Sequence, residues 1–264
     1  MSTALNLPSE RRTFLHRAGA VFAAAALPAL STPAAAPERR IALVIGNGAY
    51  KSAPLKNPVR DAEAVASSLK QLGYEVVLRR DVGLFDLIEA LRDFSLRAAD
   101  SSVRLLFYAG HGIQAKGRNY LLPIDTVLQG EDEIATKAAD VSEFVDRLSA
   151  IKRGMNIVVL DACRVNPFAG GVIVGPDGRR VRFRGLTPAG LAPLDAPVGT
   201  LVAFSTSPNG VALDGPVGAH SIYAKHLLAH LQTPGLPSSN YSSACASAWP
   251  KRPSAYRSRG SRPA

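Results

Sequence analysis

A histidine and a cysteine stand at equivalent places in this chain, each shortly after a run of apolar, strand-forming residues. His111 follows the run Leu105 to Tyr108 by three residues, and Cys163 follows the run Ile157 to Leu160 by three residues. A cysteine becomes a strong nucleophile when a base takes its proton, and an imidazole within hydrogen-bond reach is such a base. We therefore predict that His111 and Cys163 form a catalytic dyad that attacks a carbonyl carbon.

The glycines beside the histidine fit the same chemistry. Gly110 and Gly112 lack a Cβ atom, so a substrate backbone could approach them closely. An attacked carbonyl develops negative charge on its oxygen, which backbone N–H groups can stabilise. We expect the N–H groups of Gly112 and Cys163 to form this oxyanion site. Either His111 or Cys163 taken alone is more often a packing residue; the repeated context is what favours a dyad.

The elements that must position these residues alternate between short apolar strands and amphipathic helices. We predict strands over residues 41–45, 74–78, 103–108, 156–160 and 199–204, and helices over 61–72, 84–98, 141–151 and 221–231. This alternation indicates an α/β fold of three layers, a mostly parallel sheet sandwiched by helices. Ligands of such sheets bind beyond the carboxyl ends of the strands, where His111 and Cys163 are expected.

Five sequence blocks, in order, resemble those of bacterial caspase-like and metacaspase-like cysteine peptidases. The blocks are Ile45–Asn47, Leu55–Ala62, Tyr108–Gly112, Asn119–Asp125 and Leu160–Phe168. The interval of 52 residues from His111 to Cys163 is also similar to that of about 50 residues in caspases. The resemblance covers about residues 39 to 237. It implies a caspase-like sheet, with His111 as general base and acid and Cys163 as the nucleophile that forms a thioester acyl-enzyme.

Two acidic residues match the substrate-binding positions of metacaspases. They are Asp61 and Asp161, and the match implies cleavage after Arg or Lys, because a basic side chain needs carboxylates around it. The expected partners are therefore protein or peptide substrates with basic residues. A second interpretation of Asp61 is an acid that complements the dipole at the start of a helix. Asp161 would raise the pKa of a neighbouring thiol unless it served another partner.

We expect no cofactor and no metal site, with calcium as the one candidate to test. Many metacaspases need calcium, and Asp125 matches one of their ligand positions. The run Glu131 to Glu133 could add oxygen ligands. However, the acid expected shortly after the nucleophile is missing, because Ala169 and Gly170 stand there. No spacing of histidines and cysteines suits zinc.

The net charge of +10 lies mainly at the two ends of the 264-residue chain. Residues 1–36 carry a net charge of +2 and residues 238–264 carry +5, so the residues between them are close to neutral. Such a domain gives no reason to expect a nucleic-acid partner.

The first 36 residues have the order of an export signal: Arg11 and Arg12, then an apolar run from Ala18 to Leu30, then alanines. The paired arginines resemble the twin-arginine class, which implies a periplasmic or secreted protein. The apolar run is shorter than a membrane-spanning helix, so we expect no stable membrane insertion after removal of the signal. A membrane anchor or a disordered leader is the other interpretation.

We predict a peptidase domain over residues 37–237, followed by an irregular basic tail over residues 238–264. One set of permitted codons for Ser238 to Pro250, read two bases later, encodes Glu-Gln-Leu-Phe-Lys-Arg-Val-Arg-Ile-Gly-Val-Ala, which has the pattern of an amphipathic helix. The tail is therefore interpreted as a frameshift product, and a genuine basic tail is the alternative. The arginine-rich segment Phe168 to Leu186 is a candidate for self-cleavage.

Three functions stay open. The first is a cysteine endopeptidase with the His111 and Cys163 dyad. The second is a catalytically inactive caspase-like module that binds proteins. The third is a hydrolase of another group that uses a similar pair.

Overall fold

The structure is a computed structural model that describes residues 38–51, 53–163, 172–174, 180–182, 191, 194, 196–205, 216 and 218–231. The expected export signal, the basic tail and most of the segment after Cys163 lie outside the described residues.

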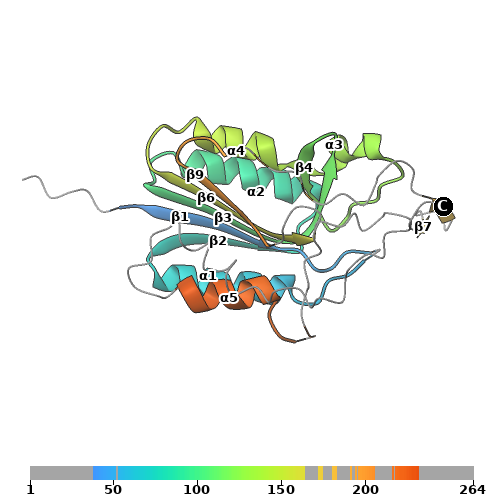
Figure 1. Ribbon diagram of the computed structural model, residues 1–264, viewed down its shortest axis with the longest axis horizontal. Helices are drawn as coiled ribbons and strands as arrows, with labels where there is room; N and C mark the ends of the chain where they lie inside the picture. The colour runs from blue at the N-terminus through green and yellow to red at the C-terminus, as the bar shows by residue number, and fades with distance from the viewer. Residues whose placement is uncertain are drawn as a thin grey trace, which may run out of the picture. The chain divides into compact units, whose positions relative to one another are not determined.

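Five parallel strands form the main part of a seven-stranded sheet (Figure 1). In spatial order they are β2 (Tyr74–Arg80), β1 (Arg40–Gly46), β3 (Val103–Ala115), β6 (Met155–Cys163) and β9 (Thr200–Phe204). Residues 41–46 of β1 are all buried, as expected for a strand covered on both faces. The predicted α/β fold is therefore confirmed.

Four helices cover the two faces of this sheet. Helices α1 (Pro58–Gln71) and α5 (Ile222–Leu231) lie on one face, and α2 (Leu84–Arg97) and α4 (Val141–Ser149) lie on the other (Figure 1). Strand side chains alternate between the faces, so each face has its own core. Phe107 and Val159 pack with α1 and α5, whereas Leu106 and Val158 pack with α2 and α4. No helix in the described part of the chain is long and apolar enough to span a bilayer.

The third strand is longer than the sequence predicts. The apolar pattern ends at Tyr108, but β3 continues to Ala115 and turns back into β4 (Arg118–Leu121). The turn residues Lys116 and Gly117 have φ of 48° and 76°. These are left-handed values, which suit a two-residue hairpin turn. His111 is therefore inside a strand and not beyond its end, as the predicted strand over residues 103–108 implied. The antiparallel partner supplies hydrogen bonds to backbone that would otherwise leave the sheet.

Further short elements complete the described chain. Strand β5 (Ala139–Asp140) pairs with β4, and a turn of helix η1 (Glu131–Glu133) leads into α3 (Ile134–Lys137). After Cys163, β7 (Val172–Val174) pairs with β8 (Arg180–Arg182) in an antiparallel hairpin. The candidate self-cleavage segment includes this hairpin.

Candidate active site

The two residues of the predicted dyad lie on neighbouring strands. The register of β3 and β6 pairs the Cα atoms of His111 and Cys163, at the point where β6 and its parallel pairing with β3 end. Neighbouring strands are about 4.8 Å apart, so the two backbones are side by side. His111 is buried, with 6% of its surface exposed. The fold thus brings together two residues that are 52 positions apart in the sequence.

The imidazole of His111 is oriented by the loop that follows β1. Its Nε2 lies 2.7 Å from the carbonyl oxygen of Ala53, and its ring lies 4.4 Å from the ring of Tyr50 at an angle of 53°. A carbonyl oxygen can only accept, so Nε2 carries the proton of this hydrogen bond. In the neutral imidazole, Nδ1 is then the nitrogen that can take a proton. The neutral ring is therefore held in the tautomer whose unprotonated nitrogen is Nδ1.

Two buried tyrosine hydroxyls hold the backbone around the histidine. The N–H of His111 donates to the Tyr50 hydroxyl at 2.9 Å, and the Tyr108 hydroxyl lies 2.8 Å from the His111 carbonyl oxygen. Both hydroxyls also reach the carbonyl oxygen of Leu122, at 3.0 Å and 2.9 Å. We call Tyr50, Ala53, Tyr108, His111 and Leu122 the histidine site. Tyr50 and Tyr108 were missed in the sequence, where both look like ordinary core aromatics.

Burial keeps both phenols in their neutral, donating form. It raises the pKa of Tyr50 to about 12, although hydrogen bonds from its neighbours oppose the shift. Burial likewise raises the pKa of Tyr108 well above its ordinary value. A Cβ atom on Gly110 would lie 2.7 Å from the Tyr50 hydroxyl and 2.8 Å from the Tyr108 hydroxyl. The structure thus gives Gly110 a reason other than the expected substrate approach: the two hydroxyls occupy that space.

The loop that carries Tyr50 and Ala53 is fastened at its start. Asp81 has a φ of 47°, which is unusual for a residue other than glycine. Its carboxylate accepts hydrogen bonds from Gly48 N at 2.8 Å and from Ala49 N at 2.9 Å. The fully buried Asn47 accepts a hydrogen bond from the N–H of Val82 at 3.0 Å. These contacts join the ends of β1 and β2, so the loop reaches His111 from a fixed origin.

The two predicted substrate-binding acids are brought together by the start of α5. Asp61 Oδ1 lies 2.6 Å from His220 Nδ1, and Asp61 Oδ2 accepts from the N–H of Ser221 at 3.1 Å. The Ser221 hydroxyl donates to Asp161 Oδ2 at 2.6 Å. Ser221 therefore bridges both carboxylates. We call Asp61, Asp161, His220 and Ser221 the acidic site.

The two acidic residues of the acidic site are almost closed to solvent. Asp61 is 1% exposed and Asp161 is 8% exposed. Burial raises the pKa of Asp61 against the opposing hydrogen bonds from His220 and Ser221. Asp61 lies in the first turn of α1, as the second interpretation of the sequence expected, and both of its oxygens also bond to the segment before α5. His220 and Ser221 were not predicted as site residues from the sequence.

The residues considered for calcium have other partners here. Asp125 accepts from the N–H of Leu84 at 3.1 Å and so caps the start of α2. Glu133 accepts from Gln129 N at 2.9 Å and pairs with Lys137 at 2.8 Å. Within the described ranges, no group of three or more His, Cys, Asp or Glu side chains is arranged to hold a metal ion. The prediction of no metal site, with calcium as the candidate to test, stays untested.

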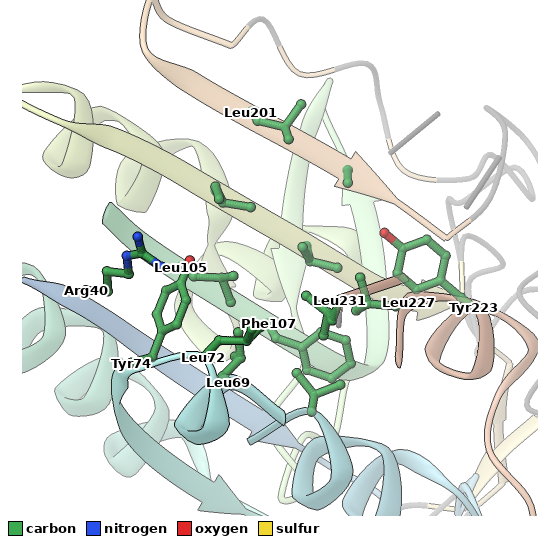
Figure 2. Close-up of a pocket in the computed structure, with 14 residues that line it drawn as sticks. Arg40, Leu69, Leu72, Tyr74, Leu105, Phe107, Leu201, Tyr223, Leu227 and Leu231 are labelled. Atoms are coloured by element: carbon green, nitrogen blue, oxygen red, sulfur yellow. The ribbon is translucent and has the colours of Figure 1, made fainter. Parts of the chain in front are cut away.

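A cavity of about 110 Å³ lies between α1 and α5, away from the polar groups described above (Figure 2). Its labelled lining residues are Arg40, Leu69, Leu72, Tyr74, Leu105, Phe107, Leu201, Tyr223, Leu227 and Leu231. This lining is mainly apolar and contains no candidate nucleophile or base. We therefore place the candidate active site at the ends of β3 and β6 and not in this cavity.

Comparison with known proteins identifies the class to which this fold and site belong. The family model described as the caspase domain matches residues 39–245, most of the chain. The chain therefore belongs to the caspase-domain family, which confirms the resemblance found in the sequence. It is a caspase-family peptidase or a related module.

Particular relatives match a shorter segment. The chain is 30% identical over 126 residues to the human mucosa-associated lymphoid tissue lymphoma translocation protein 1, and to its mouse homologue at the same identity. The matched segment is 47% of this chain and 15% of each relative. The similarity thus concerns one part of much longer proteins.

Proposed function

We propose that this protein is a cysteine endopeptidase whose catalytic dyad is His111 and Cys163. The observation that carries the proposal is the register of β3 and β6, which pairs the two residues at the edge of the sheet where ligands of α/β proteins bind. The hydrogen bond from Nε2 to Ala53 supports it, because it leaves Nδ1 to act as the base.

The reaction follows from these groups in two stages. Nδ1 of His111 takes the thiol proton of Cys163, and the thiolate sulfur attacks the carbonyl carbon of the scissile peptide. The N–H groups of Gly112 and Cys163 stabilise the oxyanion. The C–N bond then breaks as His111 returns the proton to the leaving amine, and a thioester remains. His111 next removes a proton from water, the resulting hydroxide attacks the thioester, and the acid product leaves as the thiol is regenerated.

We propose a preference for Arg or Lys at the bond that is cut. Asp61 and Asp161 supply two buried carboxylates next to the end of β6, and Asp161 is two residues before Cys163 in that strand. A guanidinium or ammonium group bound there would gain charge-assisted hydrogen bonds in a site shielded from water. The substrates would be proteins or peptides with exposed basic residues.

A second candidate function is an inactive caspase-like module that binds proteins. The observation that favours it is that both oxygens of Asp61 are bonded within the protein, to His220 and Ser221. In that case the acidic site would only fasten α5 to α1. The two candidates differ in whether Cys163 reacts.

Peptide cleavage separates these candidates. The full chain is tested on matched arginyl, lysyl and aspartyl peptides, with and without calcium, beside the variants Cys163→Ala and Cys245→Ala. We expect cleavage after Arg and Lys, its loss in Cys163→Ala, and normal activity in Cys245→Ala, because Cys245 is the only other cysteine. A thiol-reactive arginyl probe should label Cys163. Absence of both cleavage and labelling would support the inactive module.

We also propose export to the periplasm or beyond through a twin-arginine signal within residues 1–36. Replacing Arg11 and Arg12 with lysines in the full chain should retain the protein in the cytoplasm. Unchanged export of the double variant would refute this proposal.

A further inference from the structure

The segment before α5 contributes a side chain, that of His220, which contacts the carboxylate of Asp61. His220 Nδ1 is 2.6 Å from Asp61 Oδ1, and this is an ion pair when the imidazole is protonated. The two partners differ in exposure: the side chain of Asp61 is 2% exposed and that of His220 is 33% exposed. The imidazole therefore covers a buried carboxylate from the solvent side.

A histidine in this position makes the contact that a basic substrate would need. Imidazolium and guanidinium groups both present N–H donors and positive charge to a carboxylate oxygen. The two cannot occupy the same side of Oδ1 at once. We propose that His220 is a specificity-determining residue that competes with the basic side chain of the substrate for Asp61. This inference rests on the proposed function, in which Asp61 binds that side chain.

The contacts around His220 would let its imidazole move away from Asp61 without unfolding α5. Ser221 keeps its own bonds to Asp61 Oδ2 and Asp161, and its hydroxyl accepts from Ala224 N at 2.9 Å, which caps the helix. Rotation of the imidazole alone therefore frees Oδ1. Upstream, the carbonyl oxygen of Gly218 accepts a hydrogen bond from Arg60, so the backbone before His220 is held while the ring rotates.

The charged groups around His220 come from two elements. On α1 they are Asp61 and Arg60, whose guanidinium donates to the carbonyl oxygen of Gly218, and on β6 there is Asp161, which Ser221 bridges. The contact to Asp61 is the one that a basic ligand would have to replace.

The test measures binding of agmatine, which carries the guanidinium of arginine but has no peptide bond to cleave. Its dissociation constant is determined by calorimetry with the full chain, for the wild type and for His220→Gln. We expect agmatine to bind about tenfold more tightly to His220→Gln, because the imidazole no longer occupies Asp61 Oδ1.

Two controls define the site. His226→Gln, on α5, should bind agmatine as the wild type does, and Asp61→Asn should abolish the binding. Thermal unfolding shows whether each variant is folded. His220→Ala serves as a second variant if glutamine lowers the stability, and we expect it to bind agmatine at least as tightly as His220→Gln.

The outcomes separate this inference from the proposed peptidase. Equal agmatine affinity in the wild type and both His220 variants, or absence of binding in all of them, overturns the competition. Cleavage after Arg with equal affinities would leave the peptidase standing and remove the role of His220. Conversely, tighter binding in the His220 variants without any peptide cleavage would keep the competition and remove the peptidase.

Discussion

The histidine site and the acidic site are both buried and polar, yet they are built in different ways. The histidine site is assembled from β1 to β4, within residues 50–122, and its hydrogen bonds join hydroxyl, carbonyl, backbone N–H and imidazole groups. The acidic site needs the segment before α5, because its contacts join residues 159 and 60 positions apart and include two carboxylates. The orientation of His111 is therefore fixed within the first half of the domain, whereas the two carboxylates depend on a segment much later in the chain.

The largest expected effect is on the histidine site. His111→Gln should lower kcat/KM for an arginyl peptide by about 10³-fold, because glutamine can still donate to Ala53 but cannot take the thiol proton. Steady-state kinetics measure this loss, and thermal unfolding checks that the fold is kept. His226→Gln is the control and should retain full activity. If His111→Gln kept more than a tenth of the activity, the dyad would be wrong.

In the acidic site, removal of a carboxylate should lower the stability of the folded protein. Asp61→Ala should lower the free energy of unfolding by about 3 kcal/mol, because it removes the partner of His220 and of the Ser221 N–H together. Urea unfolding gives the value. The control is Asp86→Ala, which removes an exposed acid from the first turn of α2. This control should change stability by less than about 0.5 kcal/mol. Similar values for both variants would show that the acidic site does not fasten α5.

Alkaline pH should lower the free energy of unfolding through Tyr50 in the histidine site. The unfolded chain releases the Tyr50 proton above about pH 10, whereas the folded protein keeps it until about pH 12, so stability falls as the pH rises between these values. The expected loss from Tyr50 is roughly 2 to 3 kcal/mol. Unfolding measured from pH 9 to 12 should show a shallower decline for Tyr50→Phe than for the wild type. Parallel curves would contradict the burial of this hydroxyl.

The smallest effect concerns Asp125, beyond both sites. Asp125→Ala should lower the free energy of unfolding by about 1 kcal/mol through loss of the cap on α2, and the exposed Asp132→Ala should have almost no effect. Melting curves with and without calcium test whether Asp125 takes part in a calcium site. A melting temperature that rises with calcium in the wild type but not in Asp125→Ala would show that this carboxylate binds the ion.

Much of the fold was predictable because its signals are local. Each apolar run became a strand and each amphipathic segment a helix, within a few residues at most ends, since side-chain periodicity reports which face is buried. The hairpin of β3 and β4 was missed, although Gly117 marked its turn, because the strand contains the polar and small residues around His111. Side-chain periodicity does not reveal a strand whose residues are polar or small because they belong to a site.

By itself, the sequence determined the order of the elements and the pair of residues, His111 and Cys163, that end up on neighbouring strands. It could not show what surrounds them. Tyr50 and Ala53 reach His111 across 61 and 58 positions, and His220 reaches Asp61 across 159. Such contacts depend on how the loops and helices pack on the sheet. Local patterns predict which elements form, whereas only tertiary packing decides which hydrogen-bonding partners meet at its edge.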